Sequence, residues 1–187
     1  MLNLNQLIND FWQFTVANDL ELYNEFSLQH ELGIFLRNRL SGYKIQFERN
    51  VSYFGIYGNV TIKKEVDITI FNHEKTELYA IELKYPRNGQ YPEQMYAFTK
   101  DILFMEQLKE NGFTQTCAVA LVEERPYYEG SQADGIYQYF RGGVPVSGTI
   151  YKPTGMTKGI EHIDINGSYK IEWHEQDKKR KYYIVSI

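Results

Sequence analysis

The chain has 187 residues, which is enough to bury one hydrophobic core and too few for two ordinary domains. An apolar fraction of 43% and a charged fraction of 24% argue against a disordered chain, and a formal net charge of −4 argues against a broadly basic surface for nucleic acid. No stretch approaches the roughly 20 apolar residues that span a bilayer, no signal peptide is recognisable, and Cys117 alone cannot form an internal disulfide; we therefore expect one cytoplasmic domain, residues 1–187, without membrane contact.

The first forty residues show the periodicity of helices. A first helix is expected over Leu4 to Val16, and a second has apolar residues three and four positions apart between Leu28 and Leu40. Ser41 and Gly42 follow, and Gly42 suits the left-handed position at which helices often end.

From Tyr43 the apolar residues alternate with polar ones, which predicts strands. The alternation runs over Tyr43 to Phe47, Lys64 to Phe71 and Leu78 to Tyr85, and the polar residues 72–77 separate the last two runs. Two extended runs joined by a short polar loop predict an antiparallel hairpin.

A longer helix is expected after the hairpin. Pro92 suits its first turn and Gly112 its end, and apolar residues form a stripe between them: Met95, Phe98, Ile102, Met105 and Leu108. The continuous apolar run from Thr116 to Val122 then predicts a buried central strand.

The pattern weakens after this strand, through a stretch rich in glycine and tyrosine around residues 127–160. A final hairpin is expected from Tyr169 to His174 and from Lys181 to Ile187. The order of one helix, three strands, one helix and one strand indicates the α/β (α+β) class.

Three residues on the predicted hairpin can form a site. Opposed residues of an antiparallel pair have a constant index sum, so a hairpin centred on the loop 72–77 places Asp67 opposite Glu82. Strand alternation places Lys84 on the same face as Glu82. Two facing carboxylates destabilise a sheet unless a cation lies between them, which a divalent metal and Lys84 would provide.

This combination of residues suits the hydrolysis of a phosphodiester. Carboxylates bind Mg²⁺ or Mn²⁺ while leaving room for water and a phosphate, and the metal lowers the pKa of that water. A neighbouring lysine positions the water or contacts the phosphate. Glu31 is a fourth candidate, because it lies at the edge of the apolar stripe of the second helix.

The sequence Ile81-Glu82-Leu83-Lys84, preceded by Asp67 and by a helix with an acidic residue, resembles the PD-(D/E)XK nuclease superfamily. The resemblance covers about residues 20–122 and leaves 123–187 as C-terminal additions. It implies the restriction-endonuclease-like fold, with an α-β-β-β-α-β core, a mixed sheet flanked by helices and extra C-terminal strands. Val66 stands where the family name has proline, a common departure that weakens the match only slightly.

The resemblance also implies roles for the central residues. Asp67 and Glu82 would be metal ligands for Mg²⁺ or Mn²⁺, with the backbone carbonyl of Leu83 as a third ligand, and Lys84 would be the catalytic lysine.

Two flanking residues complete the implied site. Glu31 would be the supporting acid of the preceding helix and a further metal ligand, and Gln94 the supporting polar residue of the following helix. A surface salt bridge is the ordinary alternative for Glu31.

The central residues have ordinary explanations as well. Glu82 and Lys84 fit an exposed charge pair on an edge strand, and Asp67 fits a surface acid. The same acid-x-lysine spacing occurs in Asp177-Lys178-Lys179, where a polar turn without an apolar strand argues against a site. The four histidines lack paired ligand spacing, which makes zinc improbable, and Cys117 fits a buried, inert thiol.

The sequence therefore predicts a Mg²⁺- or Mn²⁺-dependent nuclease that hydrolyses phosphodiester bonds, with DNA as the expected substrate and with basic residues at its rim: Arg37, Arg39, Lys63 and Lys64. The alternative is a non-catalytic member of the same fold that binds nucleic acid or a protein, which the acidic net charge favours. No helix-turn-helix or zinc module is recognisable, so targeting is expected to depend on a homodimer or a protein partner.

Overall fold

Three helices form where the apolar periodicity predicts them, in a computed structural model that describes residues 1–187. Asn3 caps the first helix, and Asn24 and Ser27 cap the second through reciprocal hydrogen bonds. Pro92 lies in the first turn of the third. The helices are α1 (Leu4–Ala17), α2 (Glu25–Arg39) and α3 (Tyr91–Glu110). None of the helices is both long and apolar enough to cross a lipid bilayer.

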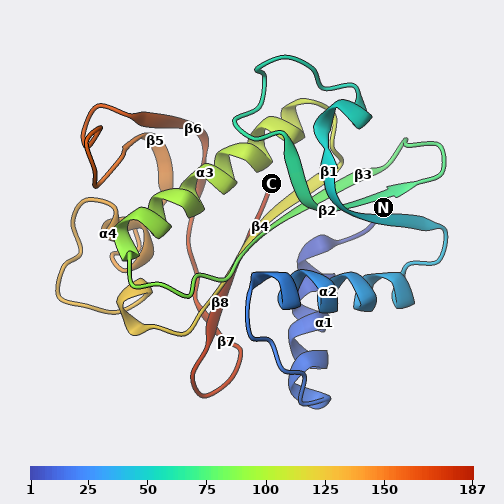
Figure 1. Ribbon diagram of the computed structural model, residues 1–187, viewed down its shortest axis with the longest axis horizontal. Helices are drawn as coiled ribbons and strands as arrows, with labels where there is room; N and C mark the ends of the chain where they lie inside the picture. The colour runs from blue at the N-terminus through green and yellow to red at the C-terminus, as the bar shows by residue number, and fades with distance from the viewer.

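The central sheet has six strands in the order β1-β2-β3-β4-β8-β7 (Figure 1). β3 and β4 are parallel and α3 connects them, whereas all other neighbouring pairs are antiparallel, so the sheet is mixed. The strands are β1 (Tyr43–Asn50), β2 (Glu65–Asn72), β3 (Leu78–Lys84), β4 (Gln115–Val122), β7 (His174–Glu175) and β8 (Lys181–Ser186).

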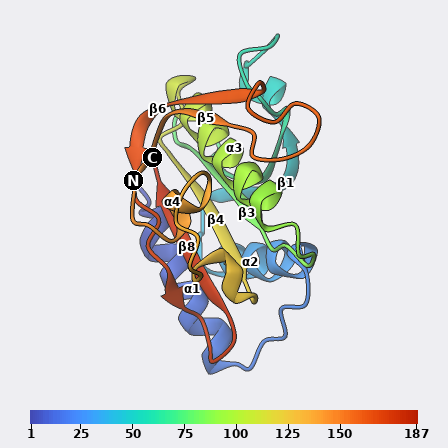
Figure 2. The ribbon, with the colours of Figure 1, turned by 90° about the vertical axis from the view of Figure 1, so that its left-hand side faces the viewer.

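Helices cover both faces of this sheet, with α1 and α2 on one face and α3 on the other (Figures 1 and 2). Alternation along β3 divides its side chains between two cores. Ile81 and Leu83 pack toward α1 and α2, whereas Ala80 packs toward α3. Glu82 and Lys84 follow Ala80 in this alternation, so both lie on the α3 face.

The C-terminal residues do not form a separate unit. β8 pairs with β4 in the central sheet, while β5 (Val146–Tyr151) and β6 (His162–Tyr169) form a small second sheet. The chain also forms three short helical turns. η1 (Val51–Phe54) lies before β2, and η2 (Arg125–Tyr127) and α4 (Tyr137–Phe140) lie between β4 and β5.

The expected C-terminal hairpin is only partly correct. Tyr169 ends β6 and pairs with Val146 of β5, and β8 pairs with only the two residues of β7. Glu106 of α3 explains this, because its carboxylate accepts hydrogen bonds from the N–H of Gly167 (2.6 Å) and the hydroxyl of Tyr169 (2.9 Å). The segment is thereby held against α3, a long-range contact that local alternation does not reveal.

Candidate active site

The hairpin register agrees with the sequence prediction. Paired residues of β2 and β3 run from Phe71 and Leu78 to Ile68 and Ile81, always with the index sum that relates Asp67 to Glu82. The backbone ladder ends at Ile68 and Ile81, and the N–H of Leu83 donates to the Asp67 carboxylate instead (2.7 Å). The two strands separate here, and the carboxylate of Asp67 reaches across the opening.

A cavity of about 260 Å³ lies at this opening, and we call it the carboxylate cleft. Gln29 of α2 fixes one wall, since its side-chain amide donates to Glu48 (2.5 Å) and to the backbone carbonyl of Asp67 (2.9 Å). Glu48 interrupts the β1–β2 pairing with a φ of 48°, a left-handed conformation that is strained for a non-glycine residue. The cleft is lined by Glu25, Phe26, Gln29, Glu48, Asp67 and Leu83.

Two lysines meet the acids on the α3 side. The ammonium group of Lys63 contacts Glu82 (2.6 Å) and Asp101 of α3. The ammonium group of Lys84 donates to the carbonyl of Leu83 (2.8 Å) and lies 3.3 Å from Glu25 and 3.8 Å from Asp101. The sheet and both neighbouring helices therefore contribute to one charged cluster.

Burial dominates the electrostatics of this cluster. It raises the pKa of Glu82, which is only 2% exposed, well above its usual value, and the charges of Asp67 and Asp101 raise it further. Burial also raises the pKa of Asp67 to about 6, although Lys84 and the Leu83 N–H oppose the shift. Burial lowers the pKa of Lys63, but Asp101 and Glu82 outweigh it, so Lys63 stays charged.

The cluster is short of positive charge. Four carboxylates face two ammonium groups, an excess of two negative charges when every group is ionised. Glu82 Oε2 and Asp101 Oδ2 are buried without a hydrogen-bond partner, which is costly for a carboxylate oxygen. The carboxylates in the cluster are Glu25, Asp67, Glu82 and Asp101.

These donors fit a hard divalent cation better than a zinc ion. No group of three or more His, Cys, Asp or Glu side chains is arranged to hold a metal. Mg²⁺, however, is commonly bound through one or two carboxylates, with waters and substrate phosphate as its other ligands. Glu82 with its unpartnered oxygen, Asp67 and the Leu83 carbonyl provide such a partial set.

The structure does not bring Glu31 or Gln94 to this cluster. Glu31 lies about 200° around α2 from Gln29, and its carboxylate is 3.6 Å from His30. Gln94 donates to Asn88 (3.1 Å) and lies two turns, about 10 Å along α3, before Asp101. Among the acids of α2, Glu25 reaches the cluster, with one oxygen 3.3 Å from Lys84 and the other accepting the N–H of the residue after Lys84 (2.9 Å).

Sequence reasoning missed Asp101 and Glu25, and it expected Lys63 only at the rim of the site. Asp101 had a detectable signal, because an acid between Phe98 and Ile102 lies within the apolar stripe of α3. Glu25 precedes the periodic region of its helix, and Lys63 belongs to an irregular loop, so neither position indicates burial or contact.

The expected basic rim is largely absent. Of the four residues, Lys63 joins the cluster itself and Lys64 donates to the carbonyl of Gly58. Arg37 and Arg39 stack on Phe47 and Phe35 near the far end of α2. Arg37 is eight residues beyond Gln29, about 12 Å along the helix axis, so it lies away from the cleft.

Two negative expectations agree with the structure. Asp177 accepts hydrogen bonds from the backbone N–H groups of Lys179 (2.7 Å) and Arg180 (2.9 Å), which closes a polar turn. Cys117 is buried in β4, and burial raises the pKa of its thiol to about 12.

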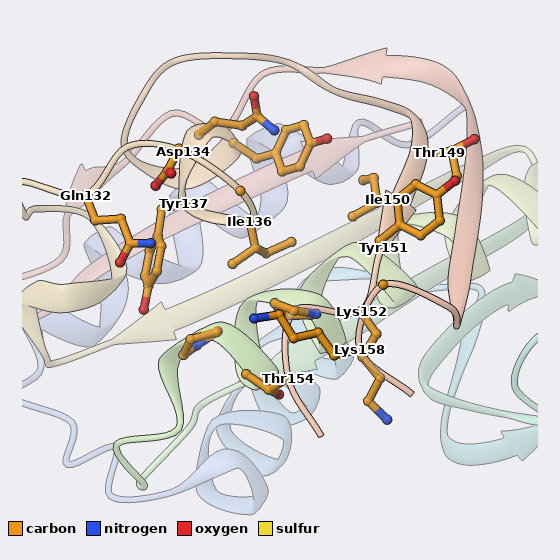
Figure 3. Close-up of a pocket in the computed structure, with 16 residues that line it drawn as sticks. Gln132, Asp134, Ile136, Tyr137, Thr149, Ile150, Tyr151, Lys152, Thr154 and Lys158 are labelled. Atoms are coloured by element: carbon orange, nitrogen blue, oxygen red, sulfur yellow. The ribbon is translucent and has the colours of Figure 1, made fainter. Parts of the chain in front are cut away.

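A second and larger cavity, about 500 Å³, lies among the C-terminal additions; we call it the C-terminal pocket (Figure 3). Figure 3 shows Gln132 and Tyr137 on one side and Thr149 and Tyr151 on the other. Its Lys152 is paired with Glu161 (3.2 Å).

Comparisons of the chain with protein-family models, with curated proteins and with solved structures found no match. The carboxylate cleft adjoins a charged cluster with buried acids of raised pKa, the Leu83 carbonyl and two lysines, which is a combination suited to binding a divalent cation beside a phosphate.

Proposed function

We propose that the protein is a Mg²⁺- or Mn²⁺-dependent nuclease of the PD-(D/E)XK type that hydrolyses phosphodiester bonds, with DNA as the expected substrate. The observation that supports this most is the meeting of Asp67, Glu82 and Lys84 where β2 and β3 separate, in a buried cluster with excess negative charge. The succession α2-β1-β2-β3-α3-β4 also has the order of that superfamily's core. Phe26, 70% exposed at the cleft, offers a ring on which a base can stack.

The residues of the charged cluster have distinct roles in this proposal. Asp67, Glu82 and the Leu83 carbonyl would hold the metal, which supplies a water of lowered pKa and neutralises charge on the phosphoryl oxygens. The ammonium group of Lys84 donates to the Leu83 carbonyl, so it lies beside a proposed metal ligand. From there it would orient the attacking water or contact the phosphate. The Glu25 carboxylate lies 3.3 Å from the Lys84 ammonium group and positions it.

The test is cleavage of supercoiled plasmid and of single- and double-stranded DNA and RNA, with Mg²⁺, Mn²⁺ or a chelator. We expect cleavage with either metal and none with the chelator, and Lys84→Ala should lower it by roughly 100-fold or more without loss of metal binding. Lys158→Ala, a lysine of the C-terminal pocket, is the matched control and should cleave normally.

Two results would contradict the proposal. Cleavage that Lys84→Ala leaves unchanged would belong to another site or to a contaminant. Absence of metal-dependent cleavage on every substrate, together with retained oligonucleotide binding, would favour the non-catalytic binding module, which agrees with the net charge of −4.

A further inference from the structure

A cation already lies between two acids of the cluster. Lys63 comes from the loop between η1 and β2, and its ammonium group is 2.6 Å from Glu82 Oε1 and in contact with Asp101 Oδ1. The side chains of Glu82 and Asp101 are only 3% and 4% exposed, whereas that of Lys63 is 30% exposed. The lysine thus enters the cluster from the surface and connects β3 with α3.

The backbone around Lys63 is fixed independently of this contact. Thr61 donates to the carbonyl of Lys63 (2.7 Å), and the N–H of Ile62 donates to Gln107 of α3 (2.7 Å). These bonds hold the loop while the four-carbon side chain reaches inward. The ammonium group can therefore leave the cluster by rotation of its own side chain, without a change in the loop.

One ammonium group does not satisfy the two acids. Each carboxylate gives one oxygen to Lys63, while Glu82 Oε2 and Asp101 Oδ2 have no hydrogen-bond partner. Lys84, the other cation of the cluster, lies 3.8 Å from Asp101 Oδ2, which is beyond hydrogen-bonding distance. Two buried carboxylates that converge on one cation, each with an oxygen to spare, match the ligands that a divalent ion requires.

We propose that Glu82 and Asp101 form a divalent-cation site that Lys63 fills in the metal-free protein, and that Mg²⁺ or Mn²⁺ binds there by displacing the Lys63 ammonium group. This inference rests on the proposed metal-dependent function and adds two features to it. Asp101 becomes a metal ligand contributed by α3, and Lys63 becomes an internal competitor that lowers the affinity for metal.

The test is a titration of the intact protein with Mn²⁺ and with Mg²⁺ by calorimetry, which measures affinity without any substrate. Lys63→Met retains the apolar side chain and removes the charge, so it should bind Mn²⁺ about 10-fold more tightly than the wild type. Lys64→Met, the adjacent lysine, whose ammonium group contacts the Gly58 carbonyl, is the matched control and should change affinity by less than about twofold. Lys63→Gln covers the case in which Lys63→Met fails to fold.

A second pair of variants tests Asp101. Asp101→Asn should weaken Mn²⁺ binding by about 10-fold or more, whereas Glu110→Gln, which removes an exposed charge from the same helix, should leave it nearly unchanged. If the wild type binds Mn²⁺ and Lys63→Met binds it no more tightly, the displacement is wrong and the proposed function stands. If neither protein binds metal, both proposals are wrong.

Discussion

The carboxylate cleft and the C-terminal pocket differ in both volume and buried charge, and the two properties favour different cavities as the functional site. The pocket is about twice as large, at 500 Å³ against 260 Å³, and it carries lysines and tyrosines that could contact many ligands (Figure 3). The cleft, in contrast, adjoins the charged cluster, in which burial raises the pKa of Asp67 and Glu82. Unbalanced buried charge, rather than volume, marks the better candidate for chemistry.

Lys152 of the C-terminal pocket is paired with carboxylates near the surface. Lys152 lies 3.2 Å from Glu161 and 3.8 Å from Glu93, and Thr149 donates to Asp164 (2.7 Å). The carboxylates that pair with the pocket are exposed or half-exposed, so water can hydrogen-bond to the oxygens that have no protein partner. The charged cluster beside the cleft has no such compensation for the buried Glu82 Oε2, and an unpartnered buried carboxylate oxygen does not stabilise a protein.

The largest expected difference between the two cavities is in cleavage. Glu82→Gln keeps the shape of the side chain and removes a metal ligand, so cleavage should fall by about 100- to 1000-fold. Asp134→Asn makes the equivalent change in the C-terminal pocket and should leave the rate unchanged. Steady-state cleavage of one oligonucleotide by both variants is the measurement, and a pocket variant that loses more activity than the cleft variant would reverse the assignment.

The next difference is in stabilisation by metal. At a Mn²⁺ concentration about 100 times the dissociation constant, the melting temperature of the wild type should rise by roughly 5–10 °C, because only the folded state holds the ion. Asp67→Asn should lose most of this rise, whereas Asp134→Asn should keep it. Melting curves with and without Mn²⁺ measure both, and identical curves for the wild type would argue against a metal site.

The fold was largely predictable because its elements depend on local patterns. The helix caps, the Pro92 start and the alternation of β2 and β3 each act within a few residues, and the hairpin register followed from the centre of one loop. The β6 segment was not predictable, since its position depends on Glu106, which is more than fifty residues away in the chain.

The site was predictable only where strands carry it. Asp67, Glu82 and Lys84 lie on a hairpin, so alternation and register place them together. Glu31 was expected from its place at the edge of the apolar stripe of α2 and from the family resemblance, but it lies about 200° around the helix from Gln29 and points away from the cluster. Lys63 belongs to a loop whose path is fixed by contacts with α3, and no periodicity describes such a residue.

A smaller effect should appear in the pH dependence of stability without metal. The pKa of Asp67 is raised to about 6 in the folded protein from a usual value of 3.8, so between these values the folded state binds a proton that the unfolded state has released. The free energy of unfolding should therefore fall as the pH rises from about 4 to 6, by at most about 3 kcal/mol from this group.

Asp67→Asn removes this contribution together with the part of the Glu82 pKa shift that the Asp67 charge causes. Lys84, Lys63 and Asp101 also face the Asp67 carboxylate, but they remain in the variant. In a chelator, Asp67→Asn should be more stable than the wild type at pH 7, and the difference should shrink toward pH 4. Urea unfolding at four pH values measures it, and parallel profiles would show that Asp67 is not destabilised by burial.

The smallest difference concerns the two acids of α2. Glu25 and Glu31 have similarly accessible side chains, 43% and 31% exposed, but only Glu25 contacts Lys84 (3.3 Å) and the N–H of Tyr85 (2.9 Å). Glu25→Ala should destabilise the protein by about 1 kcal/mol and lower cleavage by about 10-fold, because Lys84 loses a positioning partner. Glu31→Ala should change stability by less than about 0.5 kcal/mol and leave cleavage intact. If Glu31→Ala lowers cleavage more than Glu25→Ala does, the helix acid implied by the family resemblance is correct and the one implied by the geometry is wrong.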